Sequence, residues 1–352
     1  MKDILLNSIY RDDLGTALRN NDFTKLKNKS ILITGGLGLI CSSIVDLLHL
    51  YNVNENAKIK IFIADINEPF FNTRYGSYSD IKYVKYNALE PLEFNFDFDY
   101  IIHGAGLSSP ELFMNKPVET MLSNFNGVLN LLDYSRKHNV KRMLYISSSE
   151  VYGNKLNDSS FAEDDFGVSN INSIRASYSE SKRASEVLCR SFLSEYNVET
   201  IMVRPGHIYG PTASPKDKRV SSAFAFMSAD GKPLELKSSG LIKRSYCYSV
   251  DCAVAILIVL LKGETGESYN IGNDEVITIR QMASIIANAG NVSLRVVEPS
   301  DEELKAFNPM NNSSLKNDKI KKIGYQNLFS AKTGLEHSVK IIKQVYFEDE
   351  KF

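Results

Sequence analysis

Tyr178 and Lys182 carry a phenol and an amine and lie four residues apart in the segment YSESK. If 176–196 is helical, this spacing places both side chains on one face of the helix. A nearby ammonium favours the phenolate, so Tyr178 is expected to act as a general base near neutral pH. Such pairs arise by chance in many long helices. This one gains weight from ISSSEVYG at 146–153, which places serine hydroxyls at the end of a predicted strand.

A glycine-rich turn, ILITGGLGLIC at 31–41, joins a predicted strand to a predicted helix. Gly35 and Gly38 allow the backbone to turn tightly and to approach a pyrophosphate at the helix N-terminus. Asp65 ends the next predicted strand, where a carboxylate accepts hydrogen bonds from the adenosine ribose hydroxyls. Because no Arg or Lys stands at 66–70, the pattern predicts NAD rather than NADP. The alternative is a glycine turn of an ordinary α/β protein.

The elements that must position these groups alternate from residue 30 onward between β-branched runs and amphipathic stretches, which indicates βαβ units. The predicted strands span 30–34, 59–65, 81–86, 100–105, 142–147 and 199–204, and the predicted helices span 38–51, 117–138 and 176–196. Strands this uniformly apolar are expected where helices cover both faces of a sheet. The predicted fold is α/β, a Rossmann-type doubly wound parallel sheet with a smaller mixed α/β substrate-binding C-terminal domain.

The chain has 352 residues, which corresponds to about two domains at roughly 150 residues each. We expect an N-terminal helical extension over 1–29 and an NAD-binding domain over 30–205, which a strand-helix unit at about 246–262 rejoins. The substrate-binding domain is expected to consist of 206–245 and 263–345.

Composition excludes several kinds of partner. Lys plus Arg is 41 and Asp plus Glu is 42, so no excess of positive charge is available for nucleic acid or an anionic membrane. The four cysteines are scattered without metal-ligand spacing, which predicts no metal site and favours a reducing compartment. The N-terminus lacks the apolar run of a signal peptide, and the longest apolar run, 252–261, is too short to span a bilayer. We expect a cytoplasmic protein.

Eight segments stand in an order that resembles the extended short-chain dehydrogenases/reductases, specifically their NAD-dependent nucleotide-sugar epimerase/dehydratase group. They are TGGLGLI, IIHGAG, NFNGVLNLL, SSSEVYG, YSESK, RPGHIYGP, RSYCYSVDCA and YNIGNDEVITI, and the resemblance covers about 30–345. Within the group, the segments at 103–117, 175–186 and 217–224 are most similar to UDP-glucuronate decarboxylases.

The resemblance assigns the catalytic hydroxyl to Ser148 and the catalytic pair to Tyr178 and Lys182. It implies that Glu150 moves protons at C5 of the sugar, with a solvent-facing acid at a strand end as the alternative. Dehydratases usually carry Asp immediately before this Glu, and Ser149 in its place counts against dehydration.

The resemblance also implies two sets of binding residues. The cofactor set is Gly35, Gly38, Leu39, Ile40, Asp65, Ile66, Asn87, Ala88, Gly104, Asn124, Tyr178, Lys182 and His207. The substrate set is Ser108, Ser149, His207, Arg219 and Arg244.

Several of these positions depart from the family pattern. Cys41 replaces the third glycine, so the helix is expected to pack slightly further from the strand. Asn87 replaces an Asp on the adenine side and can still form hydrogen bonds. His207 replaces an Asn that faces the substrate diphosphate and can act there as donor or cation, or else is a buried structural histidine. Arg244 matches a diphosphate-binding arginine, or is an ordinary surface arginine. A second family arginine is missing, and Arg219 can partly replace it.

The implied reaction is oxidation at C4 of a nucleoside-diphosphate sugar by NAD, as in the decarboxylases, epimerases and dehydratases of the group. One alternative is an NAD(P)H-dependent 4-ketoreductase acting on a 4-keto-6-deoxy sugar through the same residues. The non-enzyme alternative is a degenerate dinucleotide-binding regulator. The family further implies a homodimer built by 117–138 and 176–196, although core packing within one chain explains the same amphipathic spacing.

Overall fold

A seven-stranded parallel sheet organises the chain, of which the computed structural model describes residues 3–155, 157–298 and 312–348. The order is β3-β2-β1-β4-β5-β6-β10, so the direction of winding reverses between β1 and β4. The strands are β1 (Ser30–Thr34), β2 (Lys60–Asp65), β3 (Ile81–Lys85), β4 (Tyr100–His103), β5 (Arg142–Ile146), β6 (Thr200–Pro205) and β10 (Ser268–Ile271). This confirms the predicted fold class and each predicted strand to within two residues.

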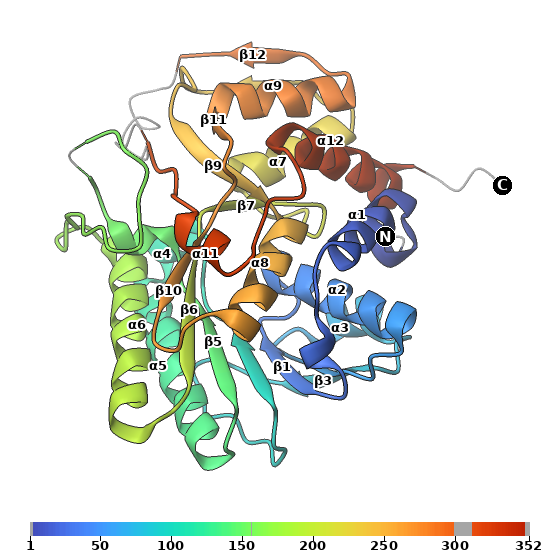
Figure 1. Cartoon of the computed structure of the whole chain (residues 1–352). Helices are drawn as coiled ribbons and strands as arrows, with labels where there is room; N and C mark the ends of the chain where they lie inside the picture. The colour runs from blue at the N-terminus through green and yellow to red at the C-terminus, as the bar shows by residue number, and fades with distance from the viewer. Residues whose placement is uncertain (1–2, 156, 299–311, 349–352) are drawn as a thin grey trace.

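Helices cover both faces of this sheet (Figure 1). One face carries α2 (Leu39–Glu55), α3 (Glu68–Tyr75) and α8 (Ser249–Lys262), and the other carries α5 (Pro117–Lys137) and α6 (Ala176–Tyr196). Side chains alternate between the two faces of β1. Ile31 and Ile33 join the core beneath α2 and α8, whereas Leu32 joins the core beneath α5 and α6. Because both faces are buried, the strands are apolar throughout rather than at every second residue.

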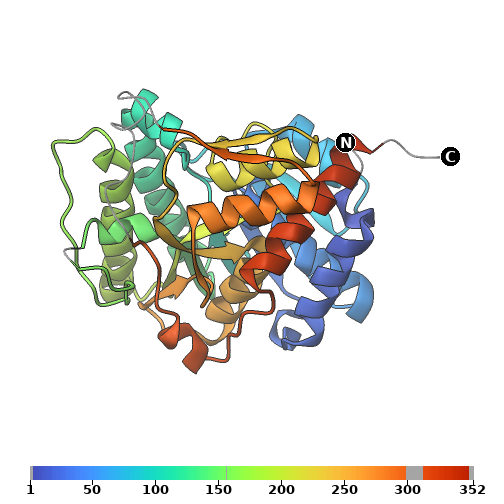
Figure 2. The same cartoon turned by 90° about the horizontal axis from the view of Figure 1, so that it is seen from above.

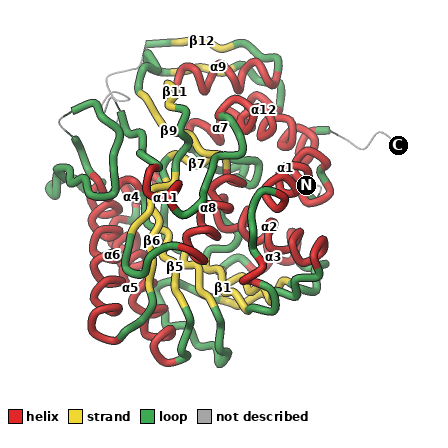
Figure 3. Tube along the Cα trace, in the orientation of Figure 1, coloured by secondary structure: helices red, strands yellow, loops and turns green. Residues whose placement is uncertain are grey.

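The smaller part of the chain carries two further sheets, which Figure 3 shows in yellow above the main one. The three-stranded sheet consists of β7 (His207–Tyr209), β9 (Lys243–Tyr248) and β11 (Val276–Thr278), and the two-stranded sheet of β8 (Leu234–Leu236) and β12 (Leu294–Val296). The accompanying helices are α7 (Val220–Ala229), α9 (Ile279–Gly290), α11 (Asp318–Lys322) and α12 (Ala331–Ile342).

The unit at 246–262 was expected to rejoin the main sheet with its strand, and this expectation is wrong. β9 pairs with β7 and β11, while only the following helix α8 packs on the main sheet. The strand that rejoins the sheet is β10, which pairs with β6. Residues 1–2 of the expected extension and 299–311 of the expected substrate-binding domain lie outside the described residues.

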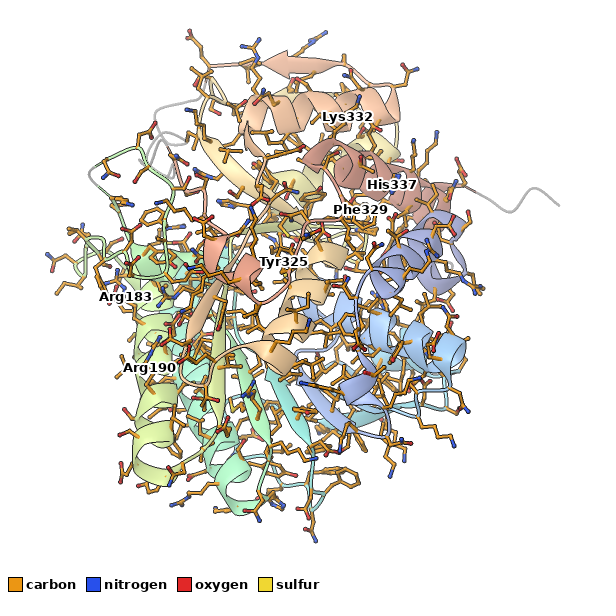
Figure 4. All side chains as sticks on the ribbon, in the orientation of Figure 1. Arg183, Arg190, Tyr325, Phe329, Lys332 and His337 are labelled. Atoms are coloured by element: carbon orange, nitrogen blue, oxygen red, sulfur yellow. The ribbon has the colours of Figure 1, made fainter. Side chains whose placement is uncertain are left out.

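The N-terminal extension contains α1 (Ser8–Arg19) between two short helices, η1 (Ile4–Leu6) and η2 (Thr24–Leu26). Helix α1 contacts α2, α8 and α12, and Figure 2 shows it (blue) beside α12 (red). The carboxylate of Asp13 accepts hydrogen bonds from the Tyr248 hydroxyl at 2.9 Å and from Nδ1 of His337, labelled in Figure 4, at 3.0 Å. The extension therefore joins the sheet domain to the C-terminal helix.

A buried carboxylate, Asp46, connects the N-terminal extension to the two helices α2 and α3. Asp46 on α2 lies 2.7 Å from the Arg74 guanidinium on α3, and both side chains are buried. The same carboxylate accepts hydrogen bonds from the hydroxyls of Tyr10 at 2.9 Å and Tyr75 at 2.8 Å. One carboxylate thus connects α1, α2 and α3.

Replacing Asp46 by Ala is expected to lower the free energy of unfolding by about 3–5 kcal/mol, because the Arg74 charge then stays buried without its partner. Urea denaturation measures this loss. A matched control is Glu55→Ala, also on α2, which breaks an exposed pair with Lys27 of the N-terminal extension and should cost less than about 1 kcal/mol. Equal losses in the two variants would contradict this role for Asp46.

Candidate active site

The turn after β1 has a backbone that only glycine accommodates. Gly35 has φ +66°, and a Cβ there would lie 2.9 Å from the backbone of Ala105. Gly38 is the N-cap of α2 and brings no side chain to cap the helix. The amide groups of Leu39 and Ile40, in the first turn, therefore point toward the end of the helix without a side-chain acceptor. This arrangement fits a pyrophosphate.

Asp65, at the end of β2, lies beside the same turn. Its Oδ2 accepts a hydrogen bond from the Leu37 amide at 3.3 Å, and its Oδ1 accepts one from the Asn67 amide at 3.2 Å. The next residue, Ile66, is exposed. The glycine turn and the carboxylate together have the shape and chemistry that the adenosine end of a dinucleotide requires, so the residues present fit NAD.

Cys41 is accommodated by a glycine in the loop that follows the neighbouring strand β4. Its thiol is buried and donates to the Thr34 carbonyl at 3.7 Å. A Cβ on Gly104 would lie 2.4 Å from this sulfur, so Gly104 supplies the room that the thiol occupies. Burial raises the pKa of the thiol to about 12, which leaves Cys41 a packing residue at neutral pH. Whether the helix packs further from the strand stays a prediction.

Asn124 supports the loop that contains Gly104. It is buried on α5, and its amide donates to the Thr120 carbonyl at 2.9 Å and to the Ser181 hydroxyl at 3.3 Å. Its Oδ1 has no hydrogen-bond partner among the described residues. A Cβ on Gly106 would come within 2.5 Å of that oxygen, so the loop after β4 approaches Asn124 closely. A direct cofactor contact by Asn124 remains a prediction.

The predicted catalytic residues come together at the carboxyl ends of β5 and β6. Ser148 begins the short helix η3 (Ser149–Tyr152), and its hydroxyl interacts with Tyr178 in the first turn of α6. The Lys182 ammonium lies 5.8 Å from the centre of the Tyr178 ring. The predicted spacing therefore places the phenol, the amine and the hydroxyl in one site.

The expected effect on the acidity of Tyr178 is wrong for the protein by itself. Burial raises the pKa of the Tyr178 phenol to about 12, and the interaction with Ser148 and the charges of Arg219 and Arg175 oppose this only in part. The sequence pattern placed the ammonium correctly but does not reveal how completely the phenol is shielded from water. A phenolate needs further positive charge.

Lys182 is buried beneath the sheet edge and donates to the Ile146 carbonyl at 2.9 Å. Burial lowers the pKa of its ammonium to about 8, and the carboxylate of Glu186, one turn along α6, limits this fall. Glu186 is held by Arg204 on β6, whose Nε and Nη2 donate to its two oxygens at 2.9 and 2.7 Å. Glu186 and Arg204 thus help to keep Lys182 charged at neutral pH.

Glu150 lies beside Tyr178 and pairs with Arg175, which the sequence analysis did not single out as a site residue. Nη2 of Arg175 donates to Oε1 of Glu150 at 2.9 Å, and both side chains remain partly exposed. The signal for Arg175 was present, since a cation at the start of a helix is unfavourable and calls for an anion nearby. Phe113 was also missed, and its ring stacks on Tyr178 at 4.2 Å.

Arg244 is a buried cation on β9 and not a surface arginine. It is 6% exposed, donates to the Lys243 carbonyl at 3.0 Å and forms no ion pair within the described residues. Glu150 lies within its electrostatic range. A buried guanidinium without a carboxylate partner is suited to an anionic ligand.

His207 and Arg219 lie near Arg244. Burial, together with the charges of these two arginines, lowers the pKa of His207 to about 3, so the cation expected as one possibility is excluded near neutral pH. His207 Nε2 lies 3.1 Å from the Ser313 hydroxyl. Arg219, at the start of α7, is partly exposed and pairs with Asp217 through Nε at 2.9 Å. The two arginines and a neutral imidazole together form a region, called here the anion-binding region, whose charge is suited to an anion.

Four predicted binding residues remain, Asn87, Ala88, Ser108 and Ser149. Asn87 donates to Glu90 at 3.0 Å, and Ala88 is buried. Ser108 is exposed, while Ser149 is half-buried within η3 next to Ser148. Their roles in binding stay predictions.

Two further properties concern the described residues only. Within 3–155, 157–298 and 312–348, no three His, Cys, Asp or Glu side chains gather as a metal site would require. In the same part of the chain, no helix combines the length and the apolar character needed to cross a bilayer.

Comparison with known proteins identifies relatives of this arrangement. Residues 31–272 match the NAD-dependent epimerase/dehydratase family. The chain is 31% identical over 303 residues to UDP-glucuronic acid decarboxylase 5 of Arabidopsis thaliana, covering 83% of this chain and 84% of the relative. Its fold is similar to that of the epimerase Mth375 of Methanothermobacter thermautotrophicus, with TM-score 0.78, 21% identity and 96% of each chain covered. It is also similar to DesIV, a dTDP-glucose 4,6-dehydratase of Streptomyces venezuelae solved with NAD, with TM-score 0.75, 23% identity, and 90% of this chain and 97% of that one covered.

NAD⁺ affinity is expected to fall severalfold as the pH rises through about 8. Lys182 has its pKa lowered from the value in the unfolded chain, so its ammonium is present below about pH 8 and is lost above it. Isothermal titration calorimetry between pH 6.5 and 9.5 measures the effect, with Lys182→Met as the control. That variant should bind more weakly and show no such step. A wild-type NAD⁺ affinity that stays constant across this pH range would contradict a role for the Lys182 ammonium in binding the cofactor.

Proposed function

This chain belongs to the NAD-dependent epimerase/dehydratase family, and from that premise we propose that it removes the carboxylate of a nucleoside-diphosphate uronic acid, with UDP-glucuronate as the candidate substrate. At the coarser level it is an NAD-dependent enzyme that modifies nucleotide sugars. The observation that carries the finer proposal is the placement of Glu150 and Arg175 beside Tyr178, with Arg244 within electrostatic range of Glu150. The identity to the Arabidopsis decarboxylase supports it.

The diphosphate is the first group that the site must hold. Arg244 is buried without a carboxylate partner in the described residues, and Arg219 lies close enough for both charges to act on His207. Two guanidinium groups neutralise a diphosphate, and guanidinium donors match phosphate oxygens in pairs. Neutral His207 can donate or accept a hydrogen bond there. The anion-binding region therefore places the sugar toward Tyr178 and Glu150.

NAD⁺ held by the glycine turn, Asp65 and Lys182 would supply a hydride acceptor for C4 and the donor that returns the hydride, and would add the positive charge of its nicotinamide to the site. With that charge and the Lys182 ammonium present, the phenolate of Tyr178 becomes accessible and takes the proton of the 4-hydroxyl. Ser148 contacts the phenol and can pass the proton between substrate and Tyr178. The sugar leaves this step as a 4-ketone.

Decarboxylation follows from the position of the ketone. The C6 carboxylate is β to C4, so the C5–C6 bond breaks with its electron pair delocalised into the carbonyl, and CO2 leaves. The resulting enolate then takes a proton at C5. Glu150 lies beside Tyr178 and can deliver or relay this proton. Ser149, in place of an Asp, leaves the site without the acid that dehydration uses.

Purified protein is expected to convert UDP-glucuronate to a UDP-pentose, with the mass of one CO2 lost. Mass spectrometry against a panel of UDP-, dTDP- and GDP-sugars measures the product. Replacing Tyr178 by Phe should lower kcat at least about 10²-fold, because the proton acceptor is gone while the ring still stacks on Phe113. Arg136→Gln, on the outer part of α5, is the control and should leave kcat unchanged.

Other products would identify the alternatives. Protein that consumes added NADH and releases no NAD⁺ on denaturation is a 4-ketoreductase, and this result would overturn the redox-neutral cycle. A biological activity that survives Tyr178→Phe unchanged would indicate a binding protein instead. Loss of water rather than CO2 would assign the protein to dehydration.

We also propose a homodimer built through α5 and α6. The two helices pack on each other and leave Val118, Met121 and Leu122 of α5 and Val187 of α6 exposed, which fits an apolar contact with a second copy. Light scattering coupled to size exclusion should give twice the chain mass of 39.5 kDa. The mass of one chain at micromolar concentration would contradict this proposal.

We further propose that the protein works in the cytoplasm. Cys41, Cys189, Cys247 and Cys252 are all buried as free thiols, which fits a reducing compartment. Recovery of the protein only from the membrane or extracellular fraction of its cells would contradict this location.

A further inference from the structure

Arg175 has donors to spare at the site. It stands immediately before α6, three residues from Tyr178, and uses Nη2 to contact one oxygen of Glu150 at 2.9 Å. No second hydrogen-bond acceptor for its side chain lies within the described residues. A guanidinium presents five N–H donors in a planar fork that matches a carboxylate. The one hydrogen bond to Glu150 uses only a small part of this donor capacity.

An aromatic stack holds the Arg175 head group beside the reacting phenol. The centre of the guanidinium lies 6.0 Å from the Phe113 ring, and Phe113 in turn stacks on Tyr178 with an interplanar angle of 10°. Phe113 is buried, so the ring between Arg175 and Tyr178 has a fixed position in the protein interior. The charge of Arg175 also acts on the Tyr178 phenol, which places the guanidinium near the atom that meets the sugar.

The two other arginines of the site, Arg244 and Arg219, already have a proposed ligand. Arg244 and Arg219 lie together near His207, where the diphosphate is proposed to bind, and Arg219 already faces Asp217. Glu150 places a negative charge at the sugar end. A sugar carboxylate arriving there would meet this like charge, unless a cation lies between the two carboxylates. Arg175 is the cation already in contact with Glu150.

We propose that Arg175 is a specificity residue, which binds the carboxylate of the incoming uronic acid while it remains near Glu150 and so selects acidic over neutral sugars. The inference rests on the proposed function and names the group that recognises its substrate. A guanidinium held against one face of the site also fixes the plane of the carboxylate. Departure of CO2 requires that the C5–C6 bond lie parallel to the orbitals of the 4-ketone, and a fixed carboxylate favours this geometry.

The test compares binding of UDP-glucuronate and UDP-glucose to the NAD⁺-loaded protein by isothermal titration calorimetry. The two ligands differ only in the carboxylate. Arg175→Gln is expected to weaken UDP-glucuronate by about 10- to 100-fold, the range for losing a charge-assisted hydrogen bond, and to change UDP-glucose by less than about twofold. Arg175→Lys, which keeps the charge but loses the fork, should fall between. Arg136→Gln, which breaks an exposed pair on α5, is the control and should alter neither ligand.

Equal weakening of both ligands in Arg175→Gln would overturn the proposal, because it indicates a general disturbance of the site. Unchanged binding of both, with kcat lowered as in Glu150→Gln, would also overturn it, since Arg175 would then act only by positioning Glu150. CO2 release by the wild-type protein is measured separately. If that release is absent while Arg175→Gln still loses UDP-glucuronate selectively, the proposed function fails and the recognition of the carboxylate stands.

Discussion

The carboxyl ends of parallel strands must meet at one edge of the sheet, and the rest of this site depends on that constraint. The loop after β1 carries the glycine turn, the loop after β4 carries Gly104, and the loop after β5 carries Ser148 and Glu150. His207 follows β6 by the same geometry. Residues that are more than a hundred positions apart in the chain therefore lie at one edge, where a single ligand could contact them. The second, smaller part of the chain then adds Arg244 to this edge.

Burial determines the chemistry of the groups placed there. It raises the pKa of Tyr178 and lowers those of Lys182 and His207, so each side chain is displaced toward its neutral form. Opposing charges are therefore placed close by, with Glu186 acting on Lys182 and the arginines acting on Tyr178. A chain with a formal net charge of −1 can bind a multiply charged ligand because a few of its cations, Arg244, Arg219 and Arg175, lie near one another at one edge. The placement of charge, rather than its sum, accounts for the proposed substrate.

The parts of the fold that follow from local pattern were predictable from the sequence. The strands from β1 to β6 stand out as short apolar runs and the helices α2, α5 and α6 as amphipathic stretches, so their bounds were predicted closely. The partners of β9 were not predictable, because a short strand can join either sheet and only tertiary contacts decide between them. The sequence predicts the helical extension over 1–29 but not its packing, because Asp13 resembles a surface acid until Tyr248 and His337 are placed beside it.

The site divides in the same way. The sequence motifs were sufficient to predict that Ser148, Tyr178 and Lys182 share one site. The acidity of Tyr178 was not predictable, because burial is a property of the whole fold. Arg175 was missed because only its contacts with Glu150 and Phe113, which depend on the fold, distinguish it from a surface arginine.

The central claim is that oxidation and reduction take place at the same sugar carbon within one turnover. Product analysis by NMR after incubation with UDP-glucuronate deuterated at C4 tests it most directly. The account predicts a decarboxylated product that retains deuterium at C4, and a decarboxylated product that carries hydrogen there would contradict it.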